Sequence, residues 1–141
     1  MNSDQLVSWK LVLLGRQIRH QRNLFVRHLD LTSEQADALR YFADHPQSTI
    51  TDFKARQQIT HQTARLIVKR LVDRQLLELT SNPNDGRSKF VGFTPAGLEK
   101  CQQLDTHIKH TSQKLFTGFT LTEQQQLLAM LARIGQNLER N

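Results

Sequence analysis

Apolar side chains recur at three- and four-residue intervals through most of the chain, which is the spacing of amphipathic helices. The first such stretch covers residues 4–28, and later ones run to just before Pro46 and over residues 50–57, 61–74 and 95–116, with a last stretch near the end. A threonine precedes each of the later stretches, as an N-cap residue would. These expected caps are Thr32, Thr49, Thr60, Thr94 and Thr122.

The helical pattern is interrupted between residues 76 and 93. Two short apolar runs flank the segment Ser-Asn-Pro-Asn-Asp-Gly, which indicates a β-hairpin with a long tip. A short helix, a tight turn, a second helix and a hairpin together form a winged helix-turn-helix, whose second helix enters the DNA major groove. We therefore expect a mostly α fold with a small β-hairpin wing, in which residues 31–94 form a DNA-binding lobe within a single domain, 1–141.

Positive charge is concentrated in the middle of the chain. Residues 51–90 hold eight basic and four acidic residues, whereas the segments before and after each have a net charge of only +1. A concentrated basic segment is typical of a face that binds a polyanion, although a solvated basic surface is an equally ordinary explanation. The position of these charges in the fold has to decide between the two.

The helix predicted over residues 61–74 has a polar face suited to a DNA groove. His61, Arg65 and Lys69 follow one another at every fourth position, with Gln62 beside them. Glutamine can pair bidentately with adenine and arginine with guanine. The first turn after Thr60, formed by His61, Gln62 and Thr63, would offer free N–H groups to a phosphate. The alternative is an ordinary amphipathic helix.

The hairpin tip supplies a second candidate contact. Arg87 and Lys89 place two cations on an extended loop, and an arginine there can reach into the narrow minor groove. Asp85 lies two residues before Arg87, so we expect it to accept a hydrogen bond from the guanidinium and aim it. The alternative is a solvated turn.

Four segments together resemble the MarR (multiple antibiotic resistance regulator) family of bacterial transcription regulators, which includes SlyA-type proteins. The wing Asn84-Asp85-Gly86-Arg87 and the following Val91-Gly92-Phe93-Thr94-Pro95-Ala96-Gly97 are similar to the family's Asp-x-Arg motif and its Thr-x-x-Gly segment. The starts of two helices, Leu31-Thr32 with Gln35 and Leu121-Thr122-Glu123, also resemble the family.

The resemblance implies a homodimer, built by the helices within residues 1–30 and 95–141, on a palindromic double-stranded DNA operator. It implies a repressor that a small-molecule effector releases. The DNA-contacting set it assigns comprises Thr60, His61, Gln62, Thr63, Arg65, Lys69, Asp85, Arg87 and Lys89. Neither the operator sequence, the effector-binding residues, nor the choice between repressor and activator can be derived from the sequence.

The chain departs from the family pattern at several positions. Family members usually have a small residue at Lys54, leucine at Gln57 and glycine at Gln58 and Gln75. The polar Gln57 and Gln58 suggest a less apolar and looser helix-turn-helix joint. Leu79 replaces a residue that is basic in many members, so we expect one phosphate contact fewer.

Other classes of protein find less support. No apolar run is long enough to span a membrane, and the N-terminus does not resemble a signal peptide, so we expect a cytoplasmic protein. Phosphate-loop, nucleophile-elbow and zinc-protease motifs are absent, so we expect neither an enzyme nor a cofactor. The runner-up is a winged-helix module that binds another protein without specific DNA binding.

Two sensing roles are weaker alternatives. The single cysteine, Cys101, is adjacent to Lys100 in a predicted first or second helical turn, which is mildly activating, yet an inert thiol is the favoured interpretation. His107 and His110 are three residues apart and could share a face, but a metal site there is the less favoured alternative to solvated histidines.

Overall fold

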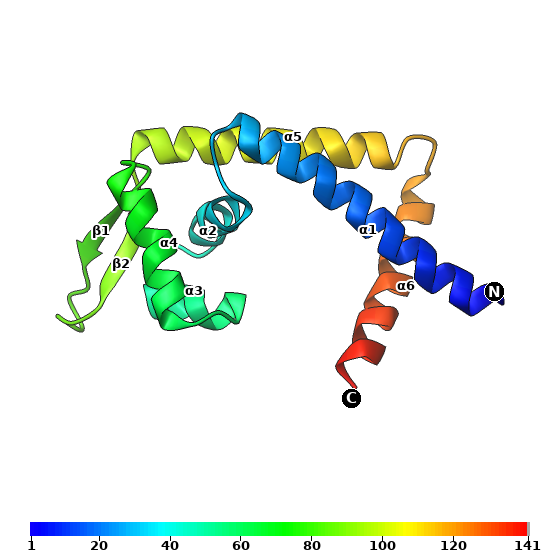
Figure 1. Cartoon of the computed structure of the whole chain (residues 1–141), viewed down its shortest axis with the longest axis horizontal. Coiled ribbons are helices and arrows are strands. Elements are labelled where there is room, and N and C mark those ends of the chain that lie inside the picture. Colours follow the sequence, from blue (N-terminus) through cyan, green and yellow to red (C-terminus); the bar gives the residue numbers. More distant parts are fainter. Residues whose placement is uncertain (141) are drawn as a thin grey trace. The chain divides into compact units, whose positions relative to one another are not determined.

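The computed structural model describes residues 1–140, which form six helices and one two-stranded sheet (Figure 1). The elements are α1 (Ser3–His28), α2 (Ser33–Asp44), α3 (Ile50–Gln57), α4 (His61–Asp73), β1 (Leu77–Ser81), β2 (Lys89–Phe93), α5 (Pro95–Leu115) and α6 (Leu121–Glu139). They belong to two compact units, Met1–Asp105 and Thr106–Asn141, and α5 runs from the first into the second. The expected mostly α fold with a hairpin wing is confirmed.

Threonine caps fix the starts of α2, α3 and α4. The side chains of Thr32, Thr49 and Thr60 each accept a hydrogen bond from the backbone N–H three residues later, at 3.1–3.2 Å. In α2 and α3 the residue at that third position also accepts from the cap's own N–H, which completes a capping box. Helix α1 begins one residue earlier than predicted because Asn2 caps it in the same way.

The predicted cap of the last helix was wrong. Helix α6 begins at Leu121, and its N-cap is Thr120 rather than Thr122. Thr120 Oγ1 accepts from the Glu123 N–H at 3.1 Å, while Glu123 Oε1 accepts from the Thr120 N–H at 2.9 Å. A carboxylate in the first turn is favoured by the positive end of the helix dipole, and the neutral amide of Gln125 lacks that advantage.

The core of the first unit lies between α2, α3, α4 and the base of the hairpin. Phe53 of α3 is almost fully buried, and its ring centroid lies 5.4 Å from that of Tyr41 and 5.2 Å from that of Phe42 in α2. Helix α4 adds Ala64, Val68 and Leu71, all buried. This apolar contact fixes which side of α4 faces inward and therefore which side faces solvent.

The hairpin is anchored at its base and free at its tip. Strands β1 and β2 are antiparallel, with a register from Leu77 opposite Phe93 to Ser81 opposite Lys89. Leu77 and Val91 are buried, and the Val91 N–H also donates to the carbonyl of Ser48 at 2.9 Å. The tip projects beyond the lobe, away from the start of α5 (Figure 1).

One hydroxyl joins the turn after α4, the hairpin and α5. Thr94 Oγ1 donates to the carbonyl of Gln75 at 2.6 Å, with the Leu76 carbonyl at 3.2 Å, and accepts from the Gly97 N–H at 3.1 Å. This last bond is the N-cap predicted for Thr94. The start of α5 is thereby fixed against the beginning of the wing.

Candidate nucleic-acid interface

All nine residues predicted to contact DNA have exposed side chains in the structure. They fall into two groups, one on α4 and one on the hairpin. The α4 group comprises Thr60, His61, Gln62, Thr63, Arg65 and Lys69, and the hairpin group comprises Asp85, Arg87 and Lys89. The fold therefore presents both groups to solvent from a single unit.

The first turn of α4 offers fewer free N–H groups than expected. The N–H of Thr63 donates to Thr60 Oγ1 at 3.1 Å, and the Thr60 hydroxyl donates to Thr63 Oγ1 at 2.8 Å. Thr60 is thus occupied as the helix cap. Within residues 1–140, the N–H groups of His61 and Gln62 have no partner and stay available to an anion.

The face of α4 opposite the core combines amide, apolar and cationic groups. With about 100° of rotation per residue, Gln62, Leu66 and Lys69 point away from the buried Ala64, Val68 and Leu71. Lys69 Nζ donates to the Asp73 carboxylate at 3.2 Å, but both side chains are well exposed, so this pair is weak and easily exchanged.

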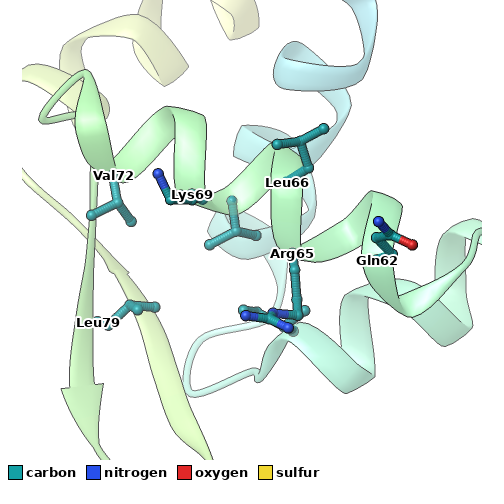
Figure 2. Close-up of a pocket in the computed structure, with 8 residues that line it drawn as sticks. Gln62, Arg65, Leu66, Lys69, Val72 and Leu79 are labelled. Carbon is teal, nitrogen blue, oxygen red and sulfur yellow. The ribbon is translucent and has the colours of Figure 1, made fainter.

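A shallow groove separates α4 from the wing. Figure 2 shows Gln62, Arg65 and Lys69 along the helix, with Leu79 of β1 directed toward α4 below Val72. Leu79 is the departure from the family pattern noted above, and its exposed side chain gives this wall of the groove an apolar surface. The cations at the groove all come from α4.

The role predicted for Asp85 was wrong in its detail. Asp85 Oδ1 accepts from the backbone N–H of Arg87 at 3.0 Å, and not from the guanidinium. Asn82 organises the same loop, since its amide donates to Ser88 Oγ and its Oδ1 accepts from the Asn84 N–H. Asp85 therefore shapes the backbone of the tip, as aspartates do in turns. Within residues 1–140 the Arg87 guanidinium has no partner and is free to bind an external anion.

Two exposed residues of α4 were missed by the sequence reasoning. Leu66 is 46% exposed although it is apolar, and Arg70 lies one turn further along the same outward side. Helical periodicity alone places both residues on the side of α4 opposite its buried positions, so their exposure could have been predicted from the sequence.

Two of the departures from the family pattern coincide with unusual backbone. Gln58, the C-cap of α3, has φ +55°, and Gln75, in the turn after α4, has φ +60°. Both angles lie in the left-handed region that favours glycine. These two joints therefore adopt the conformation for which family members use glycine.

Neither of the weaker sensing alternatives gains support. Cys101 is buried, its Sγ donates to the Leu39 carbonyl at 3.6 Å, and burial, with the nearby Asp105 carboxylate, raises the pKa of its thiol to about 11. Burial and the neighbouring His110 lower the pKa of His107. Among residues 1–140 no three histidine, cysteine or acidic side chains are grouped as metal ligands.

No helix within residues 1–140 has both the length and the apolar character that crossing a membrane requires.

Comparison with known proteins gives a consistent result. Residues 29–88, which cover the helix-turn-helix and most of the wing, match the model of the MarR family. The chain is 25% identical to the HTH-type transcriptional repressor IacR of Pseudomonas putida over 131 residues, covering 93% of this chain and 78% of IacR.

Two solved structures illustrate the likeness in fold. Staphylococcus aureus MarR in complex with salicylate and kanamycin superposes with a TM-score of 0.85 at 20% identity, covering 98% of this chain and 93% of that one. The S. aureus MepR–DNA complex gives a TM-score of 0.79 at 20% identity, covering 93% and 95%. The family match spans the helix-turn-helix, β1 and the hairpin tip, so this segment of the chain is similar to the MarR family.

Proposed function

We propose that this chain is a transcription repressor that binds double-stranded DNA as a homodimer, recognises a palindromic operator and is released from it by a small-molecule effector. The observation that best supports the proposal is the outward side of α4, where Gln62, Arg65 and Lys69 are exposed while the opposite side of the helix is fixed in the core. A rigid helix with a free polar face is the element that reads base edges in the major groove.

The wing supports the same function through a different groove. Arg87 stands exposed at a tip whose backbone is ordered by Asp85 and Asn82. Because the tip is preorganised, less loop entropy is lost when Arg87 enters a minor groove, where the negative potential is strongest. Lys89 lies at the outer end of β2, and we infer that it holds a phosphate beside the groove that Arg87 enters.

Exposed apolar side chains on α1 and α6 support the homodimer. Helix α1 exposes Leu6, Val7, Trp9, Leu14 and Ile18, and α6 exposes Leu121, Leu128, Leu131 and Leu138. Apolar surface of this extent is typical of a protein interface. A second copy of the chain is the partner that a palindromic operator requires, because the symmetry of the site mirrors that of the dimer.

The named relatives support the remaining parts of the proposal. IacR is named a transcriptional repressor, MepR has been solved on DNA, and S. aureus MarR has been solved with salicylate and kanamycin. Repression, DNA binding and a small-molecule effector are therefore each represented among similar proteins.

Selection from a pool of random duplexes at two salt concentrations tests the proposal. We expect an enriched palindrome with half-sites about one helical turn apart. The logarithm of the affinity should fall linearly with the logarithm of the salt concentration, with a slope of about −0.9 per phosphate neutralised. Weak binding without any enriched sequence would contradict the proposal and favour the protein-interaction module instead.

The oligomeric state needs a separate measurement. Light scattering should give twice the 16.3 kDa mass of one chain, and Leu128→Glu should shift the mass toward that of one chain. A monomer at micromolar concentration would contradict the homodimer.

A further inference from the structure

We infer that Leu66 is a specificity-determining residue that packs against the C5-methyl group of a thymine in each operator half-site. The inference rests on the proposed function and adds a base preference to it. It starts from an anomaly, because the side of α4 that faces away from the core has an apolar residue near its centre.

The position of Leu66 follows from the helix itself. The buried residues Ala64, Val68 and Leu71 mark the inward side of α4, and Leu66 lies almost opposite their mean direction at about 100° per residue. Its side chain is 46% exposed. In Figure 2 it points to one side of α4 while Arg65 points to the other. No part of the hydrophobic core needs a leucine here.

The neighbours of Leu66 indicate what kind of partner it meets. Residues three and four positions away are neighbours on a helix surface, which here are Gln62 and Thr63 before it and Lys69 and Arg70 after it. A protein-docking leucine is usually one of several apolar anchors on its helix, whereas the neighbours of this one along the outward side of α4 carry amide, hydroxyl and cationic groups. The other exposed leucine of the groove, Leu79, belongs to β1. The surrounding charge is complementary to a polyanion.

DNA presents one apolar group in its major groove, the C5-methyl of thymine. A leucine at the centre of a groove-facing helix would lose water on binding, which is favourable only if it meets an apolar surface. A thymine methyl supplies that surface, and the other bases offer hydrogen-bonding groups that leucine cannot satisfy. Gln62 and Lys69, one turn to either side, would fix the register of the helix at the same time.

Replacement of thymine by deoxyuridine tests the inference, because it removes only the methyl group. In the selected operator, each thymine is replaced in turn and binding is measured by anisotropy. At one position we expect affinity to fall about four-fold for one half-site and about sixteen-fold for both, as for burial of one methyl-sized group per half-site. The same replacement elsewhere should change little.

The variants assign the effect to Leu66. Leu66→Ala should bind thymine and deoxyuridine operators equally at that position, and Leu66→Met should keep a preference for thymine. Leu79→Ala, which removes the other exposed leucine at the groove, is the matched control and should keep the full preference. Melting temperatures check that the variants fold.

The outcomes separate the two proposals. An operator that is selected and bound, but tolerates deoxyuridine everywhere, would overturn the role of Leu66 and leave DNA binding intact. A methyl preference that persists in Leu66→Ala would overturn it as well. Failure to select any operator would instead count against the proposed function.

Discussion

Gly97 lies so close to Leu76 that a β-carbon at position 97 would stand 1.9 Å from the Leu76 carbonyl oxygen. The obstacle is backbone, and it belongs to the turn that leads into β1. No side-chain rotation can relieve it. Glycine at this place is therefore a requirement of the junction between the wing and α5.

Gly97→Ala should destabilise the protein, because either the wing or α5 must shift to admit the methyl group. Overpacking of this kind costs about 1–3 kcal/mol in the free energy of unfolding, measured by urea denaturation. Gly86→Ala is the matched control, since a β-carbon there meets nothing within 4 Å. Equal stability of the two variants would contradict the close approach.

Gln58→Gly should stabilise the protein. Gln58 has φ +55°, and relief of left-handed strain is expected to add about 0.5–1 kcal/mol to the free energy of unfolding. Gln58→Ala keeps the β-carbon, so it should bring no such gain. Urea denaturation of the three proteins at matched concentration makes the comparison, and a gain in the alanine variant alone would refute the explanation.

Arg87→Ala should weaken binding to every DNA sequence while leaving the melting temperature unchanged, because the side chain is exposed and its guanidinium has no partner within residues 1–140. We expect the salt slope to fall by about one contact per half-site, which is two for the proposed dimer. Lys109→Ala removes one exposed charge from α5 and serves as the control. Unchanged affinity of the Arg87 variant would exclude the wing from the DNA contact.

Gln62→Ala should relax the sequence preference at one or two base pairs per half-site, at a cost of about 1–3 kcal/mol for a lost bidentate pair. The measurement is repeated selection with the variant, compared position by position with the parent. A uniform loss over all sequences would instead make Gln62 a phosphate contact.

Cys101 should react slowly with a disulfide reagent in the native protein at pH 8 and rapidly in denaturant, because its thiol is buried and its pKa is raised to about 11. An unfolded thiol ionises near 9.0, so the unfolded chain loses its proton first. Stability should therefore decline between pH 9 and 11. Other groups also titrate in this range, so the pH dependence of the free energy of unfolding is compared with that of Cys101→Ala. The variant has no thiol and should show a smaller decline. Rapid native labelling would contradict the burial.

Local patterns in the sequence were sufficient to predict most of the helices and the hairpin. The caps at Thr32, Thr49, Thr60 and Thr94 and the turn-rich tip of the hairpin are short-range signals, and the structure confirms them. The cap of α6 was missed because Thr120 and Thr122 both precede an acceptor by three residues, so spacing alone does not separate them.

The part of the candidate site on α4 could be predicted from the sequence, because helical geometry decides which of its residues are exposed. The polar residues of α4 face solvent because the apolar ones occupy the core. Leu66 escaped notice because its residue type suggests burial while its angular position does not. The partner of Asp85 was missed because the choice between a backbone N–H and a guanidinium depends on the dihedral angles of the loop, which sequence spacing does not specify.

The hydroxyl of Thr94 has a mechanical consequence. It ties the Gln75 carbonyl to the first turn of α5, next to the close approach of Gly97 to Leu76. The junction between the wing and α5 is therefore rigid and does not act as a hinge. A rotation of the first turn of α5 should therefore carry the base of the wing with it. The hydrogen bonds that order residues 82–88 are made within the loop itself. The tip of the hairpin is therefore the part of the wing that can adjust its position without breaking these bonds.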